Sequence, residues 1–326
     1  MSHEIPYIAA INEAIHLEMA RDDSVLYFGQ NLATTENDEF LTAFGNDRVR
    51  VTPISETAEI GMAVGAALAG MRPVVELYMA EFMLVAMNQV VNEAPRLRYM
   101  SGGRVTVPLV LKAGYGFTAG WAGQHTGSIY GMFLGVPGLK LVLPATAADA
   151  KGLMATAIRD DNPVCFLHHY LLTLEPGEVP DGEHLVPFGV ADVRRTGGDV
   201  TIVATGWMVG KALAAASALA TEGIEVEVID PRTLAPLDTD TILASVHKTG
   251  RAVLVDQAPR HAAASAVIAA ELAEYGFSSL KAPIKQVTAH DVTVPYSEPM
   301  EAFVLPDEAR IADAVRQVLG TAPVVA

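Results

Sequence analysis

Glu56 is the first residue whose type and position could support catalysis. It follows a candidate strand over 48–51, with the sequence Arg-Val-Arg-Val, and it opens a helix expected over 57–69. A carboxyl group at the carboxyl edge of a parallel sheet lies where open α/β sheets bind ligands. The dipole of a helix also favours an acid in the first turn, so a purely structural role is an equal alternative.

His125 is the second residue that could take part in chemistry. It lies in a glycine-rich loop over 114–127 that follows a strand expected over 107–112. The loop is too long for a simple turn, and a histidine there can act as a general acid or base near neutral pH. The alternative is a loop histidine bonded to the backbone. His168 and His169 are weaker metal candidates, because neighbours in a strand point to opposite sides.

The motifs of several common enzyme classes do not occur in the sequence. There is no P-loop, H-E-x-x-H, paired C-x-x-C or G-x-S-x-G, and no G-x-G-x-x-G at a strand–helix turn. A lone dinucleotide-binding domain therefore has no support.

Composition excludes other classes. The formal net charge of −16 argues against binding to nucleic acid, and the sequence shows no basic patch of the kind that binds an anionic membrane surface. The start of the chain does not resemble a signal peptide, and no apolar run approaches the roughly 20 residues of a membrane helix. Cys165 is the single cysteine, so no disulfide can form within the chain, and we expect a cytoplasmic protein.

Apolar β-rich runs alternate with helical patterns, which predicts parallel βαβ units. A segment over 171–187, rich in Pro and Gly, interrupts this alternation. We therefore predict a first α/β domain over 1–170, a linker over 171–187 and a second domain over 188–326. The expected helices span 7–21, 57–69, 83–93, 147–159, 209–221, 239–248 and 261–275. The other expected strands span 24–28, 73–77, 139–143, 164–168, 200–204, 225–229 and 252–256.

The segment Thr52-Pro-Ile-Ser-Glu56, continued by Gly61-Met-Ala-Val-Gly65 and on to Pro73, resembles the cofactor segment of β subunits of 2-oxo acid dehydrogenases. The pyruvate, branched-chain and acetoin enzymes share this order of motifs. Further similar segments extend the resemblance over nearly the whole chain: Tyr99-Met-Ser-Gly-Gly103, Gln124-His125, Pro137-Gly-Leu139, residues 157–163 and residues 291–296.

The resemblance implies a fold, an activity and a set of site residues. The fold would be a pyrimidine-binding α/β domain with a parallel sheet, plus a transketolase-type C-terminal α/β domain. The activity would be decarboxylation of a 2-oxo acid, or cleavage of acetoin, with transfer of the acyl unit to lipoamide. Glu56 would hydrogen-bond the aminopyrimidine ring nitrogen of thiamine diphosphate, which promotes loss of the thiazolium proton. Phe82 would stack on the pyrimidine with Tyr78 nearby, and His125 would handle protons.

The resemblance also implies partners and metal ions. Its members bind diphosphate and magnesium through a G-D-G motif on an α subunit, and this chain has no G-D-G. An α2β2 assembly is therefore expected, and the resemblance also implies a lipoyl acyltransferase core as a partner. A potassium site is implied at Leu109, Ala157, Ile158, Asp160 and Asn162.

Two other functions remain open at this stage. One is the β subunit of a split transketolase or a non-oxidative carboligase, although those chains usually carry G-I-A-E-Q where this one has Pro53-Ile-Ser-Glu56. The other is a non-catalytic scaffolding β chain. Gly61 and Gly65 share one helix face, which is suited either to a subunit interface or to packing within the domain.

Overall fold

The computed structural model describes residues 1–30, 32, 38–117 and 120–320. The chain forms two compact units. The first unit contains Met1–Tyr115, Gln124–Thr126 and Gly135–Phe188. The second unit contains Gly116–Gly123, Gly127–Leu134 and Gly189–Ala326.

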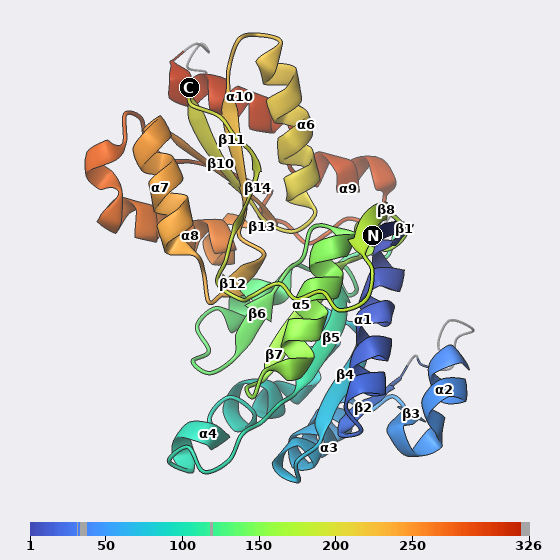
Figure 1. Cartoon of the computed structure of the whole chain (residues 1–326). Helices are drawn as coiled ribbons and strands as arrows, with labels where there is room; N and C mark the ends of the chain where they lie inside the picture. Colours follow the sequence, from blue (N-terminus) through green and yellow to red (C-terminus); the bar gives the residue numbers. More distant parts are fainter. Residues whose placement is uncertain (31, 33–37, 118–119, 321–326) are drawn as a thin grey trace. The chain divides into compact units, whose positions relative to one another are not determined.

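A parallel sheet forms the centre of the first unit, with strands in the order β6-β7-β5-β4-β2-β3 (Figure 1). Its strands are β2 (Val25–Gly29), β3 (Val49–Val51), β4 (Arg72–Met79), β5 (Val110–Tyr115), β6 (Lys140–Val142) and β7 (Val164–His169). The apolar runs of the sequence predicted each of them to within a few residues. Because β3 pairs on one side of β2 and β4 on the other, the strand order reverses at β2. Parallel sheets of this kind bind ligands at such a reversal.

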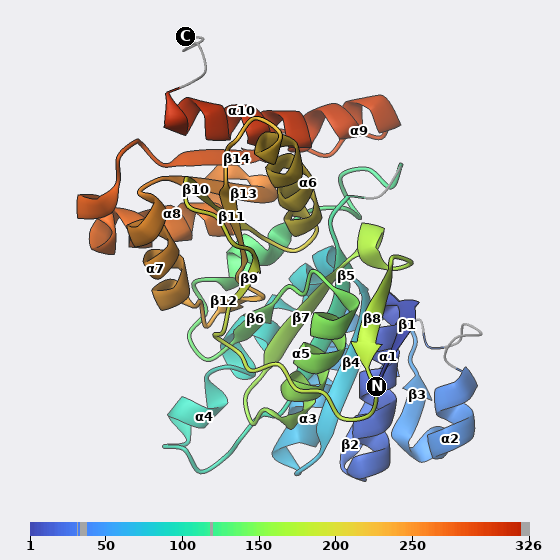
Figure 2. The same ribbon diagram turned by 45° about the horizontal axis from the view of Figure 1, so that its top comes forward.

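Helices cover this sheet. The helix α1 (Tyr7–Arg21) has the predicted bounds and lies beside α5 (Ala147–Arg159) on one face of the sheet (Figures 1 and 2). Thr146 caps the start of α5, since its Oγ1 accepts from the backbone N–H of Asp149 at 3.1 Å, and a threonine just before a helix is a cap that the sequence alone can indicate. The helix α3 (Glu56–Leu68) packs against β4. Between β2 and β3, α2 (Asp38–Arg48) is interrupted at Gly45.

Two predictions for this unit need correction. The regular helix expected over 83–93 is instead a 3₁₀ run, η2 (Ala80–Ala86), followed by a π-helical run, η3 (Asn88–Glu93), and the short α4 (Leu97–Met100). Hydrophobic spacing does not distinguish these helix types, and π-helical turns often accompany functional sites.

The segment over 171–187 contains regular structure that its prolines concealed. After the turn η5 (Tyr170–Leu172), β8 (Pro176–Pro180) pairs antiparallel with β1 (Ser2–Pro6). Because β8 pairs only with β1, one of its edges is free, and a proline whose nitrogen faces that edge removes no hydrogen bond between strands. The domain boundaries themselves stay a prediction.

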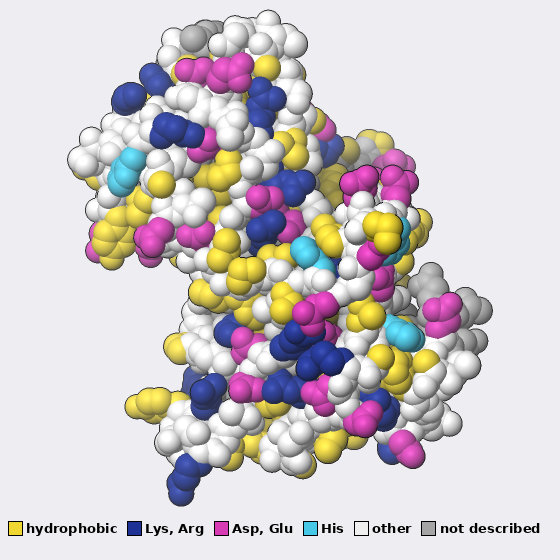
Figure 3. Space-filling model, in the orientation of Figure 1, with side chains coloured by type: hydrophobic (Ala, Val, Ile, Leu, Met, Phe, Trp, Pro, Cys, Tyr) yellow, Lys and Arg dark blue, Asp and Glu magenta, His cyan; other side chains and the backbone are white. Residues whose placement is uncertain are grey.

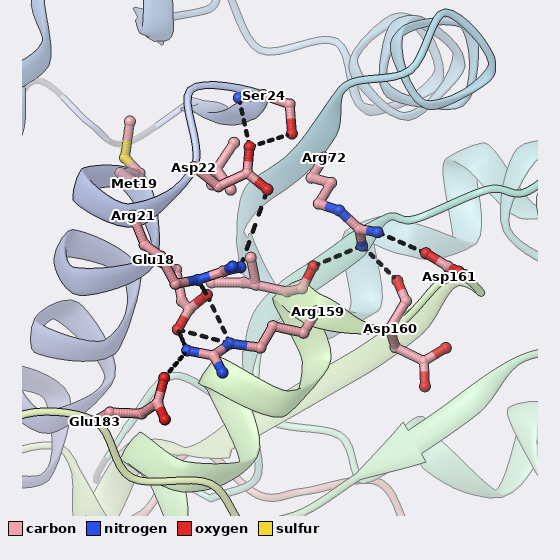
Figure 4. A network of polar contacts seen from close by, with 12 residues as sticks. Glu18, Met19, Arg21, Asp22, Ser24, Arg72, Arg159, Asp160, Asp161 and Glu183 are labelled. Carbon is pink, nitrogen blue, oxygen red and sulfur yellow. Dashed lines mark hydrogen bonds and ion pairs between the residues drawn. The ribbon is translucent and has the colours of Figure 1, made fainter.

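A buried ion network joins α1 to the end of α5 (Figure 4). Glu18 is only 2% exposed and accepts from Nη2 of Arg159 at 2.6 Å and from Nε of Arg21 at 2.8 Å. The hydrogen bond to Glu18 raises the pKa of Arg159 above its ordinary value. Without both arginines the carboxylate of Glu18 would be buried and unpaired, so the network favours one relative position of these helices.

The second unit is built on the sheet β14-β13-β10-β11-β9, parallel except for β9. Its strands are β9 (Asp192–Arg195), β10 (Val200–Ala204), β11 (Val226–Asp230), β13 (Ala252–Pro259) and β14 (Lys285–Ala289), with the short β12 (Thr233–Ala235) outside this order. The helices α6 (Met208–Ala220) and α10 (Glu308–Leu319) pack together, as do α7 (Thr239–Thr249) and α8 (Ala264–Tyr275) (Figure 2). The fold class predicted from the sequence, α/β with parallel sheets, is confirmed.

Some elements of the second unit were missed. They include β9, β12, β14, α9 (Glu298–Val304) and α10. For α10 the signals were present in the sequence, because Asp307 caps its start and Gly320 ends it in the left-handed conformation at φ 74°.

On the face in Figure 3, the Lys and Arg side chains over α1 and α5 lie among Asp and Glu side chains. Among the described residues, no helix combines the length and apolar character needed to cross a bilayer.

His3 gives a pH-dependent test of this fold. Its ring lies between Asp181 at 2.8 Å and Glu13 at 3.0 Å, and hydrogen bonds to these two acids raise its pKa. A raised folded-state pKa stabilises the fold fully below a pH of about 6.5, and this stabilisation is lost as pH rises through the folded value. We predict that His3→Gln lowers the melting temperature at a pH of about 5.5 but changes it little at about 8.5. The same substitution at the exposed His247 is the control, and a pH-independent loss for His3→Gln would contradict the prediction.

Candidate active site

Two acids from the first turn of α3 lie near the reversal of strand order at β2, and their surroundings differ. Glu59 is 2% exposed, and both of its carboxylate oxygens are bonded. Oγ1 of Thr52 donates to one oxygen at 2.7 Å, and Nε2 of Gln30 donates to the other at 3.1 Å. Glu59 therefore ties the start of α3 to the carboxyl ends of β2 and β3.

Glu56 is 8% exposed, and its carboxylate makes no hydrogen bond or ion pair with any residue that the structure describes. The positive end of the α3 dipole favours an acid at this position but does not supply a hydrogen-bond partner. Burying a carboxylate without such a partner costs free energy. The arrangement thus leaves Glu56 able to bond a group from outside the chain.

The structure brings Phe82 and His125 together. Two residues of one site must lie close to each other, so this contact is consistent with the prediction that both belong to the site. The ring of His125 stands edge-on to the ring of Phe82, with centroids 5.8 Å apart and an interplanar angle of 89°. Both side chains are half-buried, and Phe82 belongs to η2. Oγ1 of Thr57 donates to the carbonyl of Val85 at 3.0 Å, which joins the turn that carries Glu56 to the segment that carries Phe82. Residues 118 and 119 of the glycine-rich loop lie outside the described residues.

Tyr170, which the sequence did not single out, supports the end of β4. Its hydroxyl donates to the carbonyl of Tyr78 at 3.0 Å. Its ring occupies the space beside Gly114, where an added Cβ would lie 2.2 Å from the ring carbon Cε1 of Tyr170. Gly114 therefore lets a side chain from η5 cross β5 and reach β4. The Tyr78 side chain itself is 38% exposed.

The two adjacent histidines of β7 contact different neighbours. His169 stands edge-on to Tyr115 with ring centroids 5.1 Å apart, and His168 stands edge-on to Tyr170 with centroids 6.4 Å apart. Burial, and secondarily the charge of Lys112, holds the pKa of His168 well below its ordinary value, so its ring is neutral. The described residues contain no group of three or more His, Cys, Asp and Glu side chains arranged to hold a metal ion.

The predicted potassium ligands lie together around the end of α5, but their oxygens already have partners. Nη1 of Arg72 donates to the carbonyls of Ile158 and Asp160, each at 3.1 Å (Figure 4). The backbone N–H groups of Val164 and Asp160 donate to the carbonyls of Leu109 and Ala157 at 2.8 and 3.3 Å.

Further cations surround the side chains of this segment. Burial would raise the pKa of Asp160, but hydrogen bonds from Lys140 and Asn162 outweigh this and hold it below its ordinary value. Nη1 of Arg98 donates to Oδ1 of Asn162 at 2.8 Å. Arg72, Lys140 and Arg98 thus already supply positive charge here, and a potassium ion would have to use the second lone pairs of the carbonyls.

Comparisons with known proteins agree with this architecture. Residues 3–173 match the family model of the transketolase pyrimidine binding domain, and residues 189–311 match that of the transketolase C-terminal domain. A solved structure of a split-gene transketolase, described as an inactive β4 tetramer, superimposes with a TM-score of 0.81 over 97% of this chain and 99% of that one. At 22% sequence identity, that likeness concerns the fold alone.

Curated relatives cover almost the full length. The β subunit of acetoin:2,6-dichlorophenolindophenol oxidoreductase from Cupriavidus necator is 44% identical over 98% of both chains. The β subunit of the pyruvate dehydrogenase E1 component from Bacillus subtilis is 39% identical over 97% of this chain and 99% of its own. The β subunit of 2-oxoisovalerate dehydrogenase from the same organism is 38% identical over 96% and 98%. With this identity and coverage, the chain belongs to the family of β subunits of acetoin and 2-oxo acid dehydrogenases, which is built from transketolase-type domains.

Proposed function

We propose that this chain is the β subunit of a thiamine-diphosphate-dependent dehydrogenase that acts on a 2-oxo acid or on acetoin. The observation that carries the proposal is Glu56, a residue only 8% exposed near the strand reversal, whose carboxylate is bonded to no described residue. A ring nitrogen of a bound cofactor would give that carboxylate the partner it lacks.

Each site residue then has a distinct task. Glu56 would hold and exchange a proton at the aminopyrimidine nitrogen. Phe82 would present its half-buried ring as a flat surface for the pyrimidine, and the contact at 5.8 Å would orient His125. His125 would exchange protons with the substrate. Thiamine diphosphate, when bound, supplies a nucleophilic carbon that can attack a carbonyl group.

The proposal requires a partner chain. The sequence has no G-D-G, so an α subunit would hold the diphosphate and magnesium and complete an α2β2 enzyme. The relatives carry the words "subunit beta" in their names, which supports this division. Transfer of the acyl unit to lipoamide on a lipoyl acyltransferase core, and a cytoplasmic location, remain finer predictions.

The rival functions make different predictions for the reconstituted α/β pair. A dehydrogenase reduces 2,6-dichlorophenolindophenol in the presence of a 2-oxo acid or acetoin, whereas a split transketolase consumes ketose phosphates. A non-catalytic scaffold binds no thiamine diphosphate, which calorimetry with magnesium present would reveal.

We predict that Glu56→Gln lowers the turnover number of the reconstituted enzyme by about 100-fold or more, because a positioned acid or base contributes about 10²–10⁴ in rate. The melting temperature should stay close to that of the unmodified chain, since Glu56 makes no hydrogen bond that the substitution removes. Dye reduction and thermal melts measure the two effects. Glu178→Gln at an exposed position is the matched control, and full turnover by Glu56→Gln would refute the assignment.

Gly65 tests the proposed interface. It is exposed on α3, and an added Cβ would meet nothing within 4 Å, so packing within the described part of the unit does not require a glycine there. We predict that Gly65→Leu weakens α/β or β/β association by about 1–3 kcal/mol through overpacking, while the isolated chain melts normally. Light scattering alongside thermal melts measures both. Gly210→Leu on α6, where the space is equally open, is the control. An intact heterotetramer with a sharply lower melting temperature would place Gly65 in the domain core instead.

We also propose a potassium site at the end of α5. There the ion would have to bind beside the side-chain cations Arg72, Lys140 and Arg98. If the ion binds, exchanging sodium for potassium at equal ionic strength should raise the melting temperature, since a ligand that binds only the folded state stabilises it. Asp160→Ala should remove the difference between the two salts. Equal melting temperatures in both salts would mean that Arg72 and its neighbours alone neutralise these carbonyls.

A further inference from the structure

The carboxyl edge of the second unit's sheet carries a feature that the proposed function does not use. From β10 the chain leads to β11 on one side and then to β13 on the other, so the strand order reverses at β10. Open parallel sheets bind ligands in the crevice beside such a reversal. Here β10 ends before Thr205, and β13 ends with residues 256–259.

A pocket of about 270 Å³ opens at this edge. It is lined by the ends of β13 and β14, by the loop around η4 (Ile129–Phe133) and by the segment over 292–294. Pockets that hold drug-sized ligands have volumes of about 300–1,000 Å³, and this pocket is slightly smaller. The pocket is therefore large enough for a small molecule.

A buried acid, Asp256, does not line the pocket itself but fixes two of the segments that do. Asp256 is fully buried and accepts hydrogen bonds from the Tyr130 hydroxyl and from the backbone N–H groups of Ala258 at 2.9 Å and Ser265 at 3.1 Å. Tyr130 belongs to η4, so this bond holds the loop over the end of β13.

The next residue, Gln257, has one half of its amide satisfied and the other half not. It is 1% exposed and lines the pocket. Its Nε2 donates to Oγ of Ser128 at 2.8 Å, whereas Oε1 has no hydrogen-bond partner among the described residues. A buried carbonyl oxygen without a donor costs free energy, and a ligand that donates to it would remove that cost.

The rest of the lining sets the chemical class of that ligand. None of the described lining residues is Asp, Glu, Lys, Arg or His. An ionised ligand would lose its hydration there without gaining a counter-charge. Phe117, Ile129, Pro259 and Val294 form apolar walls that suit a hydrocarbon body.

We propose that this pocket binds a small uncharged molecule with an apolar body and one hydroxyl group, which donates its hydrogen bond to Oε1 of Gln257. Glu56 is not among the lining residues, and the proposal does not depend on the proposed function.

Three four-carbon probes of similar size test the proposal on the isolated full chain: 2-butanol, 2-butanone and 2-oxobutyrate. The readout is the ¹³C-methyl resonance of Met132, a pocket residue, assigned through Met132→Leu. We expect 2-butanol to shift this resonance saturably and to bind about fivefold more tightly than 2-butanone, the value of one hydrogen bond. We expect 2-oxobutyrate to leave it unchanged. Met62 on α3, which is 49% exposed and belongs to the first unit, serves as the reference methyl and should not shift.

Gln257→Leu should abolish the preference for the alcohol, and Gln317→Leu, the same change at an exposed position of α10, should preserve it. Equal binding of alcohol and ketone by the unmodified chain would overturn the proposal, as would shifts confined to Met62 or the absence of a saturable shift. If Gln257→Leu does not fold, the alcohol-to-ketone ratio of the unmodified chain still decides the question.

Discussion

A buried carboxylate needs a partner, and this requirement organises the candidate site. The first turn of α3 carries two acids at the strand reversal. Glu59 takes hydrogen bonds from Thr52 and Gln30, so it anchors the helix to β2 and β3. Glu56 has no such bonds within the described chain and is held in place by the anchored helix. One acid thus supplies rigidity, and the other keeps its hydrogen-bonding capacity for a ligand.

Phe82 and His125 are likewise positioned by residues that do not themselves take part in the proposed chemistry. The contact between Phe82 and His125 requires that η2 leave β4 in a fixed direction. Tyr170 provides this by bonding the carbonyl of Tyr78, and it can reach β4 only because Gly114 has no side chain. Thr57 adds a second tie between α3 and η2. Residues outside the reacting set therefore position the residues inside it.

Both units place an acid beside a strand reversal, Glu56 near β2 and Asp256 on β13 next to β10, but with opposite outcomes. Asp256 in the second unit is bonded by Tyr130 and by two backbone N–H groups, so it has a structural task. The unsatisfied group there is the neutral amide oxygen of Gln257, in a pocket whose described lining is uncharged. An acid without a partner suits proton exchange, whereas an unpaired amide oxygen suits recognition of a hydroxyl.

The sequence by itself determined the features that depend on neighbours a few residues away. The bounds of α1, the Thr146 cap, the alternating strands and helices, and the position of Glu56 at a strand–helix junction all follow from local periodicity and capping. Only the tertiary structure decided which of the two acids in one helical turn is paired, because Gln30 and Thr52 come from other segments. It likewise placed the guanidinium of Arg72 on the carbonyls expected to hold potassium, and paired β8 with β1 across most of the first unit's sequence. Hydrogen-bond partners distant in the chain leave no local pattern, so their effect on charge and bonding appears only when the segments fold together.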